Sequence, residues 1–133
     1  MKLDIEVTIS KNDFEAIAAD IRSRLNVVLR KVALDLERRA KDNADQMIYN
    51  GNNRNPLPTG ALKASIFTVT NKFSTYEQAV AEAKSLNPSA QMIARPVVDA
   101  ELTAFVAVGV LYGLYVNFGT VNVPARPFFT QAV

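Results

Sequence analysis

The sequence predicts an α+β fold, in which a long N-terminal helix packs on a mostly antiparallel sheet with a short inserted helix. Apolar residues recur at helical spacing from Phe14 to Ile48, with no Pro or Gly before Gly51. Short runs rich in β-branched and aromatic residues follow, separated by breaker residues. A chain of 133 residues is expected to be a single domain, 1–133, with a core of its own.

The N-terminal third predicts a strand and then the long helix. Lys2 to Ile9 alternates strictly between polar and apolar residues, which is typical of a half-buried strand. The helix is expected to span about 35 residues, or roughly 50 Å at 1.5 Å per residue. A helix of this length extends past so small a domain. We expect its middle turns to pack on the chain's own sheet, whereas its ends either follow the sheet or pack against a neighbouring subunit.

The polar side of this helix carries mixed charge. Its basic residues are Arg22, Arg24, Arg30, Lys31, Arg38, Arg39 and Lys41. The pairs Asp35–Arg39 and Glu37–Lys41 place the acid before the base at i,i+4, an order that supports a solvated helix. We favour the interpretation that this side of the helix is exposed to solvent. Contact with a partner ring or with DNA phosphates is the alternative.

The middle of the chain predicts short elements. Asn50–Pro58 is a loop by its Asn, Gly and Pro content, and we expect it to be mobile before assembly. Residues 61–64 predict a helical turn and residues 65–70 a strand, while Tyr76–Leu86 predicts a short amphipathic helix. The segment from Met92 to Val98 is ambiguous.

The last third predicts a hairpin. Leu102 to Val110 has the composition of a strand. Gly109 to Tyr112 is expected to turn the chain, and Leu114 to Phe118 to return as the second strand of the hairpin.

Composition argues against an enzyme. The chain has no Cys and no His, which removes disulfides, thiolate metal sites, the commonest general base and the commonest metal ligand. No Gly-rich phosphate loop is present. Asp42 and Asp45 form a close acidic pair, but they lie beside Lys41 on the solvated side of the helix. We therefore expect no catalytic residue, no cofactor and no metal.

Charge and hydropathy limit the partners. A net charge of +2 is too small to argue for nucleic acid by itself. The start of the chain alternates charged and apolar residues, unlike a signal peptide. No run approaches the ~18 apolar residues that span a bilayer. We expect a protein that is kept in a cytoplasm-like compartment and has no membrane partner.

Two prolines near the C-terminus define a stiff segment. Pro124 and Pro127 fix their own φ and push the preceding residues toward extended geometry. Pro124–Val133 is thus predicted to be a docking arm that projects Arg126 and two adjacent rings. Arg126 is expected to contact a partner, with an intrachain salt bridge as the alternative. At least one of Phe128 and Phe129 is expected to fill the chain's own core.

The aromatic run before this arm has two interpretations. Tyr112 and Tyr115 could stack on nucleic-acid bases. Since no basic cluster is nearby in the sequence, core or interface packing is favoured.

These segments carry a family resemblance. Tyr112-x-x-Tyr-Val-x-Phe-Gly-Thr120, followed by Pro-Ala-Arg126-Pro-Phe, resembles the signature of the HK97 gp10-like proteins of tailed bacteriophages. That family is associated with the neck and tail-completion region of the virion. Thr59-Gly-Ala-Leu-Lys-Ala-Ser-Ile66 is similar to the family's Thr-Gly-x-Leu-x-x-Ser-Ile element, and the two blocks occur in the family's order. The chain departs from the family at Asn117, where relatives often have Glu, and residues 75–87 look like an insertion.

The resemblance implies a structural virion protein that joins head to tail. It implies an oligomeric ring, hexameric or dodecameric, in contact with neck, head-closure or tail proteins and assembled in the host cytoplasm. A passing contact with genomic DNA in the channel is compatible with that position. The predicted interface residues are Arg126, Phe128, Phe129, Tyr112, Tyr115, Thr59 and Gly60. Two alternatives stay open: a tail terminator that caps the tail tube, and a small DNA-binding module.

Overall fold

The computed structural model describes residues 3, 11–49 and 59–133. Helix α1 spans Lys11–Ala44 and continues as a π-helical turn, η1, over Asp45–Tyr49. The long N-terminal helix is thereby confirmed. The predicted strand from Lys2 to Ile9, apart from Leu3, and the predicted loop Asn50–Pro58 lie outside the described residues.

The other elements are short. In chain order they are α2 (Ala61–Ala64), β1 (Ile66–Thr70), α3 (Tyr76–Leu86), β2 (Ala104–Val108), α4 (Tyr112–Phe118) and the 3₁₀ turn η2 (Thr130–Ala132). The α+β class is confirmed, as are the predicted helical segments α2 and α3 and the predicted strands at β1 and β2. The ambiguous segment after α3 contributes only an isolated bridge from Met92 to Val110.

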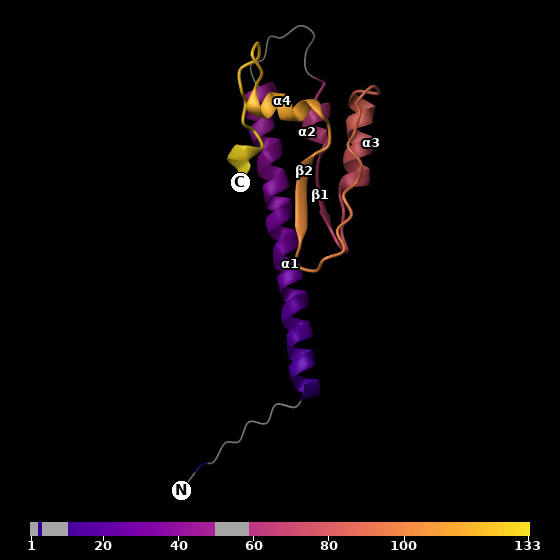
Figure 1. Ribbon diagram of the computed structural model, residues 1–133, viewed down its shortest axis with the longest axis vertical. Helices are drawn as coiled ribbons and strands as arrows, with labels where there is room; N and C mark the ends of the chain where they lie inside the picture. Colours follow the sequence, from indigo (N-terminus) through magenta and orange to yellow (C-terminus); the bar gives the residue numbers. More distant parts are fainter. Residues whose placement is uncertain (1–2, 4–10, 50–58) are drawn as a thin grey trace.

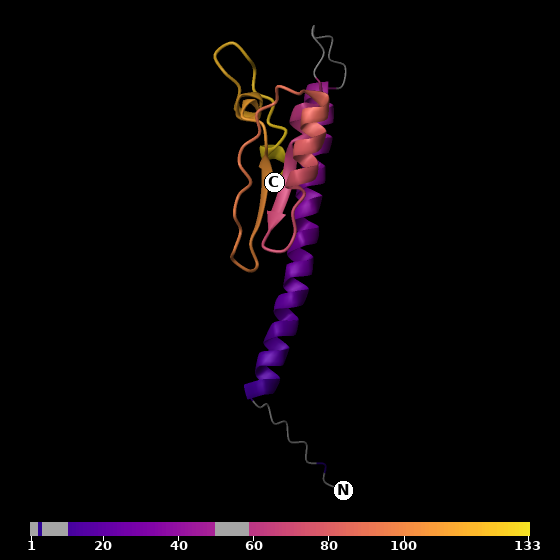
Figure 2. The same cartoon turned by 90° about the vertical axis from the view of Figure 1, so that its right-hand side faces the viewer.

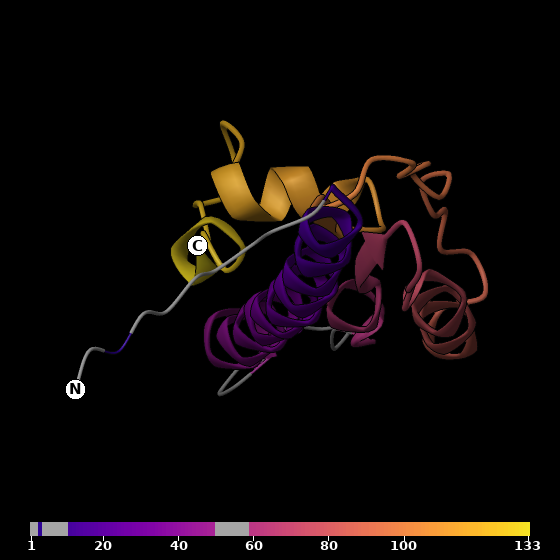
Figure 3. The ribbon, with the colours of Figure 1, turned by 90° about the horizontal axis from the view of Figure 1, so that it is seen from below.

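The two strands form an antiparallel sheet between α1 and α3. The register runs from Ile66 opposite Val108 to Thr70 opposite Ala104. Thr68 faces α1, where its hydroxyl reaches Glu37, whereas Phe67 packs with residues of α3. The strand β1 is therefore buried on both faces, and Figure 1 shows it between the two helices. Seen from below in Figure 3, α3 lies to one side of α1, and α4 with η2 to the other.

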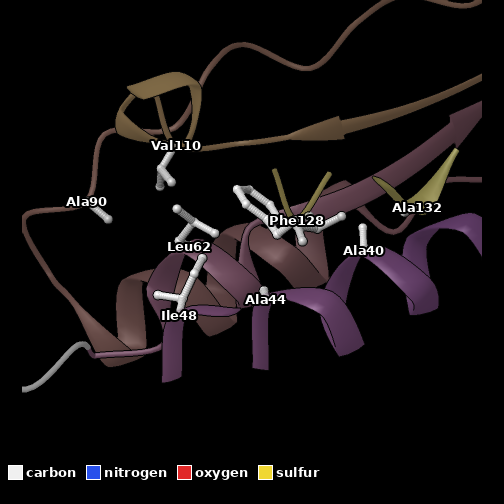
Figure 4. Packing of buried hydrophobic residues seen from close by; sticks show 9 residues of the cluster. Ala40, Ala44, Ile48, Leu62, Ala90, Val110, Phe128 and Ala132 are labelled. Atoms are coloured by element: carbon white, nitrogen blue, oxygen red, sulfur yellow. The ribbon is translucent and has the colours of Figure 1, made fainter. Parts of the chain in front are cut away.

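The main core forms where the second half of α1 meets the C-terminal segment. Ala40 and Ala44 present only methyl groups, which lets the large ring of Phe128 pack close to the helix (Figure 4). Leu62 and Val110 close the same cluster from α2 and from the segment after β2. Phe128 is fully buried. The last residues of the chain thus complete the core that holds α1 against the sheet.

The predicted hairpin is wrong. Residues 112–118 form helix α4 instead of a returning strand. The helix buries Gly113 and Asn117, which are four residues apart, and exposes Leu114, Tyr115 and Phe118. Its inner side is small and polar and its outer side is apolar, the reverse of the usual pattern. The β-branched and aromatic residues that suggested a strand mostly lie on this outer side.

The first half of α1 extends well beyond the sheet. In Figures 1 and 2 no other described helix or strand lies beside its free end. Among the described residues, the first buried position of α1 is Ala33. The overhang predicted from helix length is therefore present: Asn26 Oδ1 accepts a hydrogen bond from the N–H of Leu102, and about 15 residues of helix, roughly 22 Å at 1.5 Å per residue, precede this contact.

Candidate functional site

An apolar stripe runs along the overhanging half of α1. Its members lie three or four residues apart, so they share one side of the helix. We call this set the α1 stripe: Phe14, Ile17, Ile21, Leu25, Val28 and Val32. Phe14 is 64% exposed and Ile17 and Ile21 are each 52% exposed. A contiguous patch of large apolar side chains on a soluble domain marks an interaction site more often than a solvated surface.

A second apolar surface covers the outer side of α4. We call Leu111, Leu114, Tyr115 and Phe118 the α4 face; all four are exposed. The helix sits close to β2 because residue 113 is Gly: a Cβ there would lie 2.5 Å from Cγ1 of Val108. Only Gly permits this approach.

A pocket of about 410 Å³ opens beside the α4 face. Its apolar lining includes Val108, Leu111, Leu114, Phe118 and Phe129. We call it the α4 pocket. Its volume is in the range of protein binding pockets, so it could accommodate apolar side chains of a partner.

The predicted docking arm is held to its own chain. Asn117 Oδ1 accepts hydrogen bonds from the N–H of Phe129 and of Thr130, at 3.1 and 3.2 Å. Asn43 Nδ2 donates to the carbonyl of Phe128 at 3.1 Å, and the N–H of Arg126 donates to the carbonyl of Val116 at 2.8 Å. These contacts fix the arm against α1 and α4.

The two adjacent rings of the arm have different surroundings. The expectation that one of them fills the core is confirmed by Phe128, whose complete burial leaves it inaccessible to a partner. Phe129 is half-buried and lines the α4 pocket.

Arg126 is the one charged side chain between residues 104 and 133. Within the described residues its guanidinium makes no ion pair or hydrogen bond, so the alternative of an intrachain salt bridge finds no support there. Its side chain is half-buried beside α4. A guanidinium without a carboxylate, next to an apolar surface, is suited to anchor an acidic group of a partner.

The two predicted tyrosines lie at the same end of the molecule. Tyr112 is partly exposed, and burial of its ring raises the pKa of the phenol above its ordinary value. Tyr115 is 59% exposed and belongs to the α4 face. No basic side chain other than Arg126 occurs in this part of the sequence, which favours packing over stacking on nucleic-acid bases.

Thr59 and Gly60 have local structural roles. Thr59 Oγ1 accepts a hydrogen bond from the N–H of Ala61 at 3.2 Å. Gly60 has φ of 85°, the left-handed conformation that favours glycine, and α2 starts directly after it. Further along this block, the hydroxyl of Ser65 donates to the carbonyl of Leu62 and accepts from the N–H of Val110. The Thr-Gly-x-Leu-x-x-Ser-Ile element therefore ties α2 to the segment that leads into α4.

Sequence reasoning missed the role of Glu37. The sequence places it on the solvated side of α1, but the structure buries it against β1. Its carboxylate accepts from the hydroxyls of Thr68 and Thr75 at 2.6 and 3.1 Å, and from Nζ of Lys41 at 2.8 Å. The predicted Glu37–Lys41 ion pair forms within α1. The same Glu37 carboxylate also connects this helix to the sheet through Thr68. No periodicity could have shown this, because the hydroxyl groups come from distant residues.

The basic run of α1 is largely paired within the chain. Arg24 pairs with Asp20, Arg38 and Arg39 both pair with Asp35, and Lys41 pairs with Glu37. The hydrogen bond from Arg38 is the main cause that lowers the pKa of Asp35 below its ordinary value. The guanidinium of Arg30 stacks 3.7 Å from the ring centre of Phe73. These contacts leave little of the basic run available for phosphate groups.

Within the part of the chain that the structure describes, no group of three or more His, Cys, Asp or Glu residues could hold a metal ion. No helix among these residues is long and apolar enough to cross a membrane. Comparison with known proteins adds no assignment: no protein-family model, curated protein or solved structure matches this chain.

Proposed function

We propose that this protein is a structural component of a tailed-phage virion, which assembles into a ring at the neck or tail-completion region and joins head to tail. The observation that carries the proposal is the pair of unpartnered apolar surfaces, the α1 stripe and the α4 face. A chain that leaves so much apolar side-chain surface in water is suited to assembly, since burying each large side chain contributes on the order of 1.5–3 kcal/mol.

The sequence resemblance supports the same role. Both blocks that resemble the HK97 gp10-like family serve local structure in this chain, one around α2 and the other around α4 and the C-terminal arm. Asn117, which departs from the family's usual Glu, supplies a side-chain oxygen that anchors the arm. An acid at this position would offer the same kind of acceptor, so the departure is compatible with the family's arrangement.

The DNA-binding alternative receives less support. Four of the eight basic residues on α1 pair with carboxylates and a fifth stacks on a ring. Proteins that bind DNA through phosphates keep their basic side chains free to displace counterions. A salt-sensitive affinity for DNA, falling steeply between low and moderate salt, would favour this alternative.

The direct test adds the purified protein to phage particles that were assembled without it. We expect it to bind to these particles and to restore the attachment of tails to DNA-filled heads, as seen by electron microscopy. Location distinguishes the neck role from the tail terminator: binding to heads supports the neck, and binding to the ends of free tails supports the terminator. A protein that binds to neither would contradict the proposed function.

A further inference from the structure

We propose that copies of this chain associate head to tail, with the first turns of the α1 stripe of one copy seated in the α4 pocket of the next. This inference rests on the proposed ring and names the contact that would build it. The described residues that carry it are Phe14, Ile17 and Ile21 on one side of the contact, and Leu114 and Phe118 on the other.

The placement of the two surfaces favours a head-to-tail contact. Figure 1 shows the free end of α1 and helix α4 at opposite ends of the molecule. When two different surfaces of one chain bind each other, every added copy presents a fresh surface, and the series ends only when a ring closes. A symmetric contact of stripe against stripe would stop at a dimer and leave the α4 face exposed.

The shapes of the two surfaces are matched. Phe14, Ile17 and Ile21 recur at i, i+3 and i+7, the spacing with which an amphipathic helix occupies an apolar groove. The α4 pocket offers about 410 Å³ with an apolar lining. Rings and branched aliphatic side chains are the groups that such a pocket accommodates.

Charge selects which part of the stripe docks. Residues 11–20 contain three acids and one base, a net charge of −2, and one of the acids, Asp20, pairs with Arg24; Arg22, Arg30 and Lys31 make the following turns basic. Arg126 lies on the same arm as Phe129 and Thr130, which line the α4 pocket, and its guanidinium has no carboxylate among the described residues. The acidic first turns therefore complement the pocket, and the basic turns that follow would be repelled. Glu15 lies within these first turns, between Phe14 and Ile17 in the sequence.

The test uses two single variants that each damage one surface. Ile17→Asp alters the stripe and Leu114→Asp alters the pocket; both side chains are mostly exposed, at 52% and 60%, so neither change disturbs the core. Val27→Asp is the matched control, because Val27 is 52% exposed but lies on another side of α1. Masses are measured by sedimentation velocity, and circular dichroism confirms that each variant is folded.

We expect each of the two variants to be monomeric alone, because each lacks half of the contact. An equimolar mixture should form a heterodimer and nothing larger, since one intact stripe then meets one intact pocket. Val27→Asp should assemble like the unaltered chain. Arg126→Glu should weaken the heterodimer about tenfold, and Glu15→Lys in the other copy should restore it.

Three outcomes would overturn the inference. One is assembly of either surface variant at the level of the unaltered chain. Another is a mixture that stays monomeric, and the third is a pocket variant that still dimerises through its stripe. Binding to particles separates these failures from failure of the proposed function: if the surface variants still join heads to tails, the ring uses other contacts and the virion role stands.

Discussion

At the scale of single residues, Asn117 supports the C-terminal segment with one oxygen atom. Its Oδ1 accepts from two consecutive backbone N–H groups, and the hydroxyl of Thr130 approaches it at 3.5 Å. The side chain is 5% exposed, so water cannot readily replace it. This acceptor holds the backbone beside Phe128, the ring that completes the core.

Replacing Asn117 by Ala should destabilise the fold by about 1–3 kcal/mol, because two partly buried backbone N–H donors would lose their acceptor. Asn117→Asp keeps an oxygen at the same place and should cost less. Urea denaturation followed by circular dichroism measures both changes. An Ala variant that unfolds at the midpoint of the unaltered chain would show that the arm is held by other contacts.

The buried carboxylate of Glu37 gives a second prediction. Thr68→Val keeps the shape of the side chain but removes the donor at 2.6 Å from this carboxylate, so we expect a loss of about 1.5–3 kcal/mol, as for hydrogen bonds to charged groups. Thr70→Val is the control, since its half-buried hydroxyl makes only long hydrogen bonds to uncharged groups: it donates to the carbonyl of Phe73 at 3.3 Å and accepts from the N–H of Lys72 at 3.4 Å. Equal stability of the two variants would contradict the role that we assign to Glu37.

At the scale of elements, α1 could be predicted and α4 could not. The 3-and-4 spacing of apolar residues in α1 continues through the overhang, where none of the described helices and strands covers it. The stripe could be predicted because its exposed apolar residues keep the same helical spacing as the buried ones. In α4 the buried positions are Gly113 and Asn117. Neither carries a large apolar side chain, so apolar periodicity in the sequence does not indicate this helix.

The end of α4 depends on a glycine conformation. Gly119 has φ of 77° and ψ of 175°, a region that is almost restricted to glycine. A Cβ at this position would lie 2.7 Å from the backbone nitrogen of Ala125. The glycine thus turns the chain sharply from α4 into the arm.

Gly119→Ala should therefore cost at least about 1–3 kcal/mol, the penalty of a strained backbone. Gly60→Asn is the control: Gly60 is also left-handed, but the nearest atom to a Cβ there is a leucine methyl at 3.6 Å, and Asn tolerates this conformation. Thermal unfolding measures both. A Gly119→Ala variant as stable as the Gly60→Asn variant would contradict the geometry described for the end of α4.

At the scale of the whole molecule, the fold packs the second half of α1 into the core and leaves the large apolar side chains of its first half exposed. The buried half is anchored by Ala40, Ala44 and Glu37, and the exposed half carries the α1 stripe. The α4 face adds a second apolar surface at the other end (Figure 1). A molecule with this distribution is expected to be less stable alone than in an assembly, because association removes both surfaces from water.

The candidate site could be predicted in part. The two prolines of the arm draw attention to Arg126 and Phe129, and Phe129 lines the α4 pocket. The sequence could not show that Phe128 belongs to the core, because its partners Ala40 and Ala44 lie more than 80 residues away. Nor could it show the α4 pocket, which exists only because residues 112–118 coil into a helix.

The most direct test of the account is the solution mass of the purified chain, measured by sedimentation equilibrium over a range of concentrations. We expect a closed assembly whose mass is a whole-number multiple of 14.6 kDa and stays constant above the association threshold. A mass of 14.6 kDa at every concentration would contradict the central claim that the α1 stripe and the α4 face bind other copies of this chain.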